Sequence, residues 1–274
     1  CYFDSYQDAP DSQPEAIGGY LPLAKVYSFN PVPDTLSADK VQLVYGVQAN
    51  LFTEYIPTPE HAEMMIYPRI LALAEVAWSA PSVKNYDDFH VRALKEVEAL
   101  KAEGYHPFEL KNEIGNRPGA DQPVQHLAVG KKVAYGPDAA YYPGYSAGGD
   151  SALVDGVIGG WTYGDRRWQG FIDKKRMDVT IDMEKETEIH SVGADFMQVC
   201  GPEVFMPSEV IISVSNDGKE FTELKRMEHK VVKDDKVTFI NFGWEGNAKA
   251  RYIRYQASSG EFGGFLFTDE IVVK

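Results

Sequence analysis

Several hallmarks of common catalytic and structural sites are missing from the 274-residue sequence. It contains only two cysteines, Cys1 and Cys200, so it is not built on a disulfide framework, and we expect both to be free thiols. Its six histidines show no His-x-x-x-His or other close spacing, and neither a Gly-x-Ser-x-Gly elbow nor a phosphate loop occurs. These absences argue against a catalytic zinc site, a serine hydrolase of that type and a phosphate-loop protein.

Long apolar runs and positive charge are also scarce. No stretch of about 18 consecutive apolar residues occurs, so no segment is predicted to span a bilayer. The 27 lysines and arginines stand against 41 aspartates and glutamates, which gives a formal net charge of −14. Nucleic acid and anionic membrane surfaces are disfavoured as partners because they would be repelled at long range. A neutral or cationic ligand fits this charge better.

The start of the sequence carries no targeting signal. It has no initiator methionine and no charged segment followed by an apolar one, so no signal peptide is predicted in it. We expect the chain to begin within a longer protein. With 44% hydrophobic residues, the chain is long enough for two domains that each bury a core.

Residues 1–105 are predicted to be mixed α and β. Residues 41–51 are rich in β-branched and apolar side chains and are expected to form a buried strand. Residues 60–79 have the composition of a buried helix, in which Pro68 must lie near an N-terminus or cause a kink. A strand, a loop and a helix in this order form the βα unit of a parallel sheet.

A second helix is predicted over residues 87–104. Its apolar residues keep helical spacing, and Asp87 or Asp88 can cap its N-terminus. Gly104 suits the position just after the C-terminus, where a left-handed backbone is common.

The sequence changes character after residue 105. Residues 106–127 are rich in Asn, Gly, Pro and Gln and are predicted to be a linker. Residues 128–274 show no helical pattern but a series of short alternating strands separated by turns, which predicts an antiparallel β-sandwich. The expected strands cover residues 177–183, 188–199, 208–215, 236–242, 250–258 and 265–274.

Two short motifs in the first part combine carboxylates with aromatic rings. Residues i and i+2 of a strand share a face, so Tyr2 is expected to point with Asp4, and Phe52 with Glu54. Ligands bind at the carboxyl ends of parallel strands in barrels and doubly wound sheets. Carboxylates accept hydrogen bonds from sugar hydroxyls, and a ring packs on the C–H face of a pyranose. Alternatively, the aromatic rings belong to the core and the acids are solvated, and spacing alone does not decide between these readings.

The same residues carry a resemblance to a known family. Residues 45–55 (YGVQANLFTEY) and 67–78 (YPRILALAEVAW) look like the last strand and helix of the family 20 glycoside hydrolases, the β-N-acetylhexosaminidases. The opening Tyr2-Phe3-Asp4 resembles the tyrosine-x-aspartate motif of the preceding strand. The resemblance covers residues 1 to about 105 and implies the C-terminal portion of a (β/α)8 TIM barrel.

This resemblance implies removal of terminal N-acetylglucosamine or N-acetylgalactosamine from a glycan by substrate-assisted retention, without a cofactor. The 2-acetamido oxygen of the substrate attacks the anomeric carbon, while an adjacent Asp-Glu pair orients the acetamido group and acts as general acid and base. By the match, Tyr2 donates its hydroxyl to the acetamido oxygen. Asp4 and Glu54 bind hydroxyls of the terminal sugar, and Phe52 forms part of the hydrophobic wall. The resemblance also implies a secreted, periplasmic or cell-surface protein.

The sequence departs from the family pattern at three points. Phe52 stands where the family carries Trp, and Ile17 is the closest counterpart of another Trp. The only Asp-Glu dipeptide, Asp269-Glu270, lies in the second part of the chain, so the catalytic pair is missing. We expect the glycan site to need the missing N-terminal part of the barrel and the isolated chain to be inactive. A non-catalytic carbohydrate-binding or targeting unit and an inactive homologue remain as alternatives.

Residues 128–274 resemble the discoidin-like (coagulation-factor type C) β-sandwich, a jelly-roll fold that often serves as a carbohydrate-binding module. The motifs that carry this resemblance are Ala152-Leu153-Val154-Asp155-Gly156, Trp168-Gln169-Gly170-Phe171, Pro207-Ser208-Glu209-Val210, Ser215-Asn216-Asp217-Gly218 and Asp269-Glu270-Ile271.

Two further sites are expected in this second part. Many discoidin-like domains hold a structural calcium ion, and Asp155 and Glu270 with loop carbonyls would begin such a site; the alternative is an ordinary Asp-Gly turn and a solvated acid. Trp161 and Tyr163 are the candidates for rings that stack on a glycan, whereas Trp168 is expected in the core.

Overall fold

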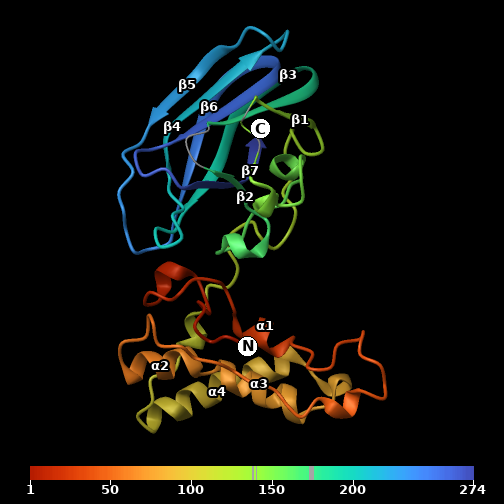
Figure 1. Ribbon diagram of the computed structural model, residues 1–274, viewed down its shortest axis with the longest axis vertical. Coiled ribbons are helices and arrows are strands. Elements are labelled where there is room, and N and C mark those ends of the chain that lie inside the picture. The colour runs from red at the N-terminus through yellow and green to blue at the C-terminus, as the bar shows by residue number, and fades with distance from the viewer. Residues whose placement is uncertain (138, 140, 173–175) are drawn as a thin grey trace. The chain divides into compact units, whose positions relative to one another are not determined.

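The computed structural model describes residues 1–137, 139, 141–172 and 176–274 (Figure 1). The chain divides into two compact units, Cys1–Gly115 and Asn116–Lys274, so the division falls inside the segment predicted to be a linker. Both parts of that segment are packed, since Phe108 and Leu110 are buried in the core of the first unit and Arg117 is buried in the second. Among the described residues, no helix is long and apolar enough to cross a membrane.

The first unit is built mainly from helices. Its α-helices are α1 Leu23–Tyr27, α2 Pro59–Ile66, α3 Arg69–Trp78 and α4 Tyr86–Ala102, and its 3₁₀ helices are η1 Pro10–Ser12, η2 Val41–Leu43, η3 Pro81–Val83 and η4 Leu110–Asn112.

Proline and a capping threonine set the limits of α2 and α3. Thr58 accepts a hydrogen bond from the backbone N–H of His61 at 3.2 Å, and Pro59 takes the first helical position of α2. Pro68 has no N–H with which to continue a helix, so the helical segment predicted from the sequence is divided there, and Pro68 lies at the N-terminus of α3.

Helix α4 agrees with the helix predicted over residues 87–104 except at its N-terminal cap. Asn85 caps α4 by accepting the N–H of Asp88 at 3.1 Å, so neither Asp87 nor Asp88 is the capping residue. Gly104 follows the helix with a φ of 91°, the left-handed conformation expected there.

The strand predicted over residues 41–51 is wrong. Val41–Leu43 form the 3₁₀ helix η2, and several apolar side chains in this stretch are exposed, including Leu43 and Tyr45. The segment has one β-type contact, an isolated parallel bridge between Tyr2 and Asn50. A buried parallel strand needs hydrogen-bonded neighbours along its length, and the described residues give this segment only the one bridge.

The core of the first unit lies between its helices and the opening segment. It is formed by Phe3, Leu23, Val26, Tyr27, Ala72, Leu73, Phe89, Ala93, Val97, Phe108 and Leu110. This packing joins α1, α3 and α4 to the segment that carries Tyr2 and Asp4.

The second unit is an antiparallel β structure, as predicted. Its strands are β1 Lys132–Tyr135, β2 Gln169–Ile172, β3 Met177–Gln198, β4 Pro207–Ser215, β5 Thr222–Glu228, β6 Thr238–Ser259 and β7 Phe265–Val273, and its 3₁₀ helices are η5 Pro143–Tyr145, η6 Ala152–Val154 and η7 Tyr163–Asp165. All the ladders between these strands are antiparallel.

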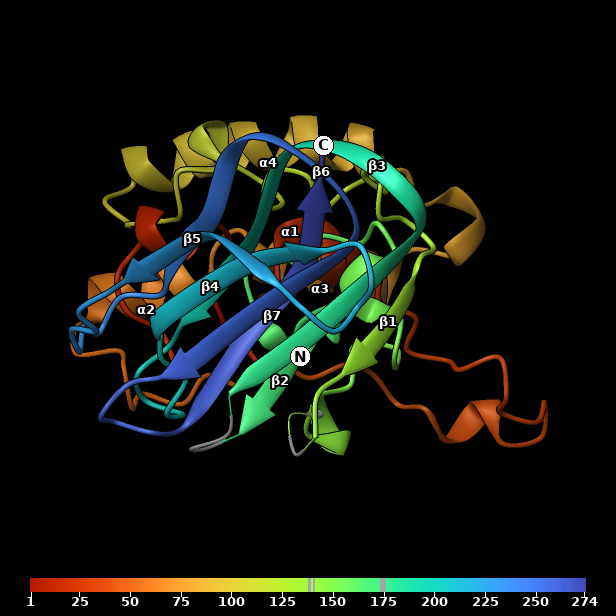
Figure 2. The ribbon, with the colours of Figure 1, turned by 90° about the horizontal axis from the view of Figure 1, so that it is seen from above.

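Two long strands connect the layers of this unit (Figures 1 and 2). The first half of β3 and the second half of β6 lie in the order β1-β3-β6-β4-β5, whereas their other halves lie in the order β2-β7-β3-β6. Each of these strands was predicted as two short ones. Register shifts near residues 182–191 let the paired strands bend without ending.

The core of the second unit fills the space between the layers. Alternate residues of β3 such as Val179, Ile181 and Phe196 are fully buried there. Trp168 is also buried, as predicted, in a neighbouring cluster with Phe267.

Candidate functional site

Tyr2 and Phe52 form an exposed aromatic pair in the first unit. The bridge that joins their segments has the N–H of Phe3 donating to the Asn50 carbonyl at 2.8 Å, and the N–H of Asn50 donating to the Cys1 carbonyl at 2.8 Å. The two rings stack with centroids 6.0 Å apart and an interplanar angle of 25°. They are 59% and 57% exposed, so they present adjoining ring surfaces to solvent.

Asp4 is hydrogen-bonded to the backbone of Phe52 and is 6% exposed. One of its carboxylate oxygens accepts the backbone N–H of Phe52, and the other is buried without a hydrogen-bond partner among the described residues. Glu54 and Ile17 are exposed. The structure therefore brings Tyr2, Asp4 and Phe52 together, whereas Glu54 makes no hydrogen bond or ion pair with any described residue.

A buried arginine holds the backbone that carries Tyr2 and Asp4. The Arg69 side chain is fully buried and donates to the carbonyls of Phe3, Ser5 at 2.9 Å, Leu21 at 3.2 Å and Met65 at 2.6 Å. Its guanidinium carbon lies 4.8 Å from the centre of the Phe3 ring. The residues between Cys1 and Ser5 are thus tied to the start of α3 by hydrogen bonds to a charged donor, which are stronger than neutral ones.

Burial lowers the pKa of Arg69 to about 9, and the negative charge of Asp4 opposes that shift. The guanidinium therefore stays charged at neutral pH. It was not among the residues singled out from the sequence, although it follows Pro68 directly in the quoted family motif.

The aspartate of the single Asp-Glu dipeptide in the sequence is held by buried contacts within the second unit. Asp269 is fully buried in the second unit, where it accepts hydrogen bonds from Arg117 at 2.8 Å and from the N–H of Gly159 at 3.1 Å. Arg117 also pairs with Asp195 and lies 4.8 Å from the Trp168 ring. Burial raises the pKa of Asp269 to about 6, and the charge of Arg117 opposes the shift. This cluster joins the loop before β2 to β3 and β7.

Glu270 belongs to the candidate calcium site of the second unit. Its Oε1 accepts hydrogen bonds from His126 Nε2 at 2.7 Å and from the N–H of Gly156 at 2.9 Å. The other ring nitrogen of His126 accepts backbone N–H groups, so Nε2 is the protonated nitrogen. Glu270 Oε2 is buried without a partner among the described residues.

Asp155 interacts with the Glu270 side chain. Burial raises the pKa of both Asp155 and Glu270, and the two carboxyl groups interact directly. The described residues contain no cluster of three or more His, Cys, Asp or Glu side chains suited to a metal ion. A cation held by this pair would need backbone carbonyl oxygens to complete its coordination.

Trp161 and Tyr163 are both half-buried against other rings. The ring of Tyr163 stacks on that of Phe267 with centroids 4.9 Å apart, and the ring of Trp161 meets that of Phe239 at 5.6 Å. Part of each ring surface is therefore already covered by protein.

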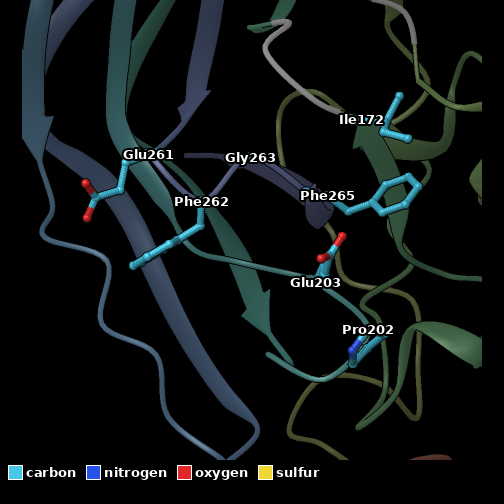
Figure 3. A pocket seen from close by; sticks show the side chains of 9 residues that line it. Ile172, Pro202, Glu203, Glu261, Phe262, Gly263 and Phe265 are labelled. Atoms are coloured by element: carbon cyan, nitrogen blue, oxygen red, sulfur yellow. The ribbon is translucent and has the colours of Figure 1, made fainter.

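A pocket that the sequence did not predict lies at one end of the sandwich. Its volume is about 440 Å³, and it lies between the β6–β7 loop, the loop that precedes β4 and the end of β2 (Figure 3). The residues that line it are Ile172, Pro202, Glu203, Gly260, Glu261, Phe262, Gly263, Gly264 and Phe265.

Aromatic and aliphatic surface surrounds this pocket, called the loop pocket from here on. Phe262 and Ile172 are 37% and 40% exposed, and Tyr142 meets the ring of Phe265 edge-on at 5.8 Å. The sequence signal for it is the Gly-Glu-Phe-Gly-Gly turn before the last strand, which sets an aromatic ring among glycines.

Two families account for these two units. Residues 1–81 match the profile of the glycosyl hydrolase family 20 catalytic domain, and residues 138–271 match that of the F5/8 type C domain. The chain therefore contains a fragment of a family 20 catalytic domain followed by a discoidin-like domain, as predicted from the sequence. The barrel to which that fragment is related is not formed in the first unit.

Curated relatives match the first part of the chain. A beta-hexosaminidase of Porphyromonas gingivalis (strain ATCC BAA-308 / W83) is 49% identical over 88 residues, which are 32% of this chain and 11% of that protein. A beta-N-acetylhexosaminidase of Cellulomonas fimi is 32% identical over 96 residues, which are 35% of this chain and 19% of that protein. The chain thus spans only a small share of the length of either relative.

Solved structures similar to the chain include carbohydrate-binding modules. A chitosan-binding module from a chitosanase/glucanase of Paenibacillus sp. IK-5 covers 55% of this chain and 99% of its own length, with 16% identity and a TM-score of 0.38. A module from Clostridium perfringens, solved in complex with GalNAc-β-1,3-galactose, covers 54% of this chain and 99% of its own length, with 18% identity and a TM-score of 0.38.

Proposed function

We propose that the chain is the C-terminal part of an exported β-N-acetylhexosaminidase that removes terminal N-acetylglucosamine or N-acetylgalactosamine from glycans. The observation that carries the proposal is the arrangement of Tyr2, Asp4 and Phe52 within the segment that matches the family 20 catalytic domain. The stacked, exposed rings suit the apolar face of a pyranose. One Asp4 oxygen has no hydrogen-bond partner among the described residues and is free to accept a hydroxyl once the buried carboxylate is reached. The catalytic Asp-Glu pair would come from the upstream part of the barrel.

In this proposal each side chain has a defined task in substrate-assisted retention. Tyr2 donates its hydroxyl to the acetamido oxygen as that oxygen attacks the anomeric carbon and the glycosidic oxygen leaves with a proton from the general acid. Asp4 and Glu54 accept hydrogen bonds from sugar hydroxyls. Phe52 provides a smaller wall than the tryptophan it replaces. Arg69 keeps the backbone around Tyr2 and Asp4 in place.

The test uses the full-length gene product and an aryl N-acetylglucosaminide. We expect Tyr2→Phe and Glu54→Gln each to lower kcat/KM by at least about tenfold, because each removes an interaction at the reacting sugar. Tyr45→Phe and Glu96→Gln are matched controls, since both alter exposed side chains that make no hydrogen bond or ion pair with a described residue. Unchanged kcat/KM in both site variants would refute the assignment. The isolated 274-residue chain is expected to show no hydrolysis.

A second function, glycan binding by the discoidin-like domain, is favoured by the loop pocket. The pocket combines exposed apolar side chains with a carboxylate, as sugar sites do. Trp161 and Tyr163 are the alternative platform. Glycan-array binding that is lost in Phe262→Ala but kept in Trp161→Ala would assign the loop pocket, and the reverse would assign the Trp161 platform. If the whole chain binds no glycan of a broad panel, the domain has a structural role instead.

We also propose a structural calcium ion between Asp155 and Glu270. The support is the buried, unpaired Oε2 of Glu270 beside a second carboxyl group, because two adjacent carboxylates require a proton or a cation to be stable when buried. Such an ion would stabilise the loop before η7 against β7 and would take no part in catalysis.

A further inference from the structure

The polar side chains that line the loop pocket are carboxylates. The polar side chains among its described lining residues are Glu203 and Glu261, and no described lining residue is basic. Neither carboxylate makes a hydrogen bond or an ion pair with any other described residue. Figure 3 shows the Glu203 carboxylate beside Phe265, whereas the Glu261 carboxylate points away from both of them. Ionised carboxylates only accept hydrogen bonds, so the Glu203 side chain suits a ligand that donates them.

Backbone contacts hold Glu203 in this wall. Its N–H donates to the Cys200 carbonyl at 3.0 Å, and its carbonyl accepts the N–H of Phe265 at 2.8 Å. Gly264 has a φ of 71°, and a Cβ there would lie 2.2 Å from the Glu203 carbonyl oxygen. Only glycine permits this close approach, so the carboxylate is presented from a fixed loop.

A lysine of the chain already lies against the aromatic wall of the pocket. The Lys233 ammonium lies 4.6 Å from the centre of the Phe262 ring and 5.5 Å from that of Phe205. Such contacts reflect the negative face of an aromatic ring. Lys233 makes no ion pair with Glu203 or Glu261 in the described structure, so the two carboxylates remain available to a ligand.

We propose that the loop pocket binds hexosamines that carry a free 2-ammonium group in preference to their N-acetylated forms. This proposal rests on the proposed glycan binding by the discoidin-like domain. The hydroxyls of either sugar can donate to Glu203, and the apolar face of either can contact the rings. Only the free amine adds a charge-assisted hydrogen bond to the carboxylate. An acidic sugar is disfavoured by the carboxylates and by the net charge of −14.

The experiment compares a fully deacetylated glucosamine trimer with the N-acetylglucosamine trimer on the 274-residue chain. Calorimetry at pH 6 and about 0.15 M salt keeps the amines charged and screens distant charges. We expect the deacetylated trimer to bind about three- to tenfold more tightly, as for a partly exposed charge-assisted contact. In Glu203→Gln the two trimers should bind equally, because the carboxamide has no charge.

Glu188→Gln is the matched control. It removes one exposed negative charge from the bent middle of β3, outside the residues that line the pocket, so the preference should persist. Equal loss of preference in Glu188→Gln and Glu203→Gln would show a non-specific attraction to the acidic chain and would overturn the proposal. Equal or tighter binding of the N-acetylated trimer would overturn it while leaving glycan binding intact. Binding of neither trimer, nor of any glycan in the panel, would overturn both.

Discussion

The hydrogen bonds of Arg69 predict a large loss of stability in the first unit when its guanidinium is removed. Arg69→Met keeps a long apolar side chain but removes the donors that bind the carbonyls of Phe3, Ser5 and Leu21. Because the site is fully buried, water does not replace those donors without opening the unit.

The expected magnitude comes from the acceptors left behind. Each buried carbonyl without a donor costs about 1–3 kcal/mol, and removing one partner of a buried charged contact costs about 3–5 kcal/mol. We therefore expect Arg69→Met to lower the free energy of unfolding of the first unit by about 3–5 kcal/mol. Arg69→Lys keeps the charge but not the forked geometry, so its loss should be smaller.

Hydrogen exchange of the full chain measures this effect unit by unit. A loss of 3–5 kcal/mol corresponds to exchange faster by about two to three and a half orders of magnitude in peptides from residues 1–27 and 59–78. Peptides from β3 and β7 serve as an internal reference. Arg92→Met is the matched control, because Arg92 is half-exposed and its pairs with Glu75 and Asp88 should contribute no more than about 1 kcal/mol. Similar exchange in the two variants would refute the reasoning.

Three further predictions concern pH, backbone and metal. Burial, with the negative charge of Asp8, raises the pKa of Glu113 to about 7 from 4.5, so the folded first unit binds more protons than the unfolded chain in that interval. Its stability should be greatest below about pH 4.5 and fall as pH rises to about 7, and Glu113→Gln should flatten that part of a urea-unfolding profile; an unchanged slope would contradict this. Gly264→Ala should disorder the loop pocket and abolish glycan binding, because the new Cβ would clash with the Glu203 carbonyl oxygen. Gly201→Ala is the control: its Cβ would have no atom within 4 Å, so binding and the melting temperature should stay unchanged. Excess Ca²⁺ should raise the melting temperature of the second unit and a chelator should lower it, with both responses lost in Glu270→Gln; a calcium response that survives Glu270→Gln would place the ion elsewhere.

The helices were predictable because their signals are local. The break at Pro68, the C-terminal glycine of α4 and the helical spacing between them depend only on neighbouring residues. The strand expected at residues 41–51 was wrong because a strand also needs hydrogen-bonded partners, which apolar composition does not supply.

In the second unit, too, the locally encoded features were predictable and the partner-dependent ones were not. Alternating apolar residues made β3, β4, β6 and β7 recognisable. The short strands β1 and β2 were not predicted, and neither was β5, whose side chains are mostly exposed. The union of two short strands in β3, and of two in β6, could not be predicted because bulges that bend a strand interrupt its alternation.

The sequence by itself determined the two families and the antiparallel class of the second unit, and it placed Asp4 and Phe52 with Tyr2, since motifs and alternation are local patterns. Only the tertiary structure decided that Arg69 supports that group, that Asp269 pairs with Arg117, and that Glu203 and Phe262 line one pocket. These contacts join residues far apart in the chain. They depend on how the chain folds back on itself, and no spacing in the sequence encodes that directly.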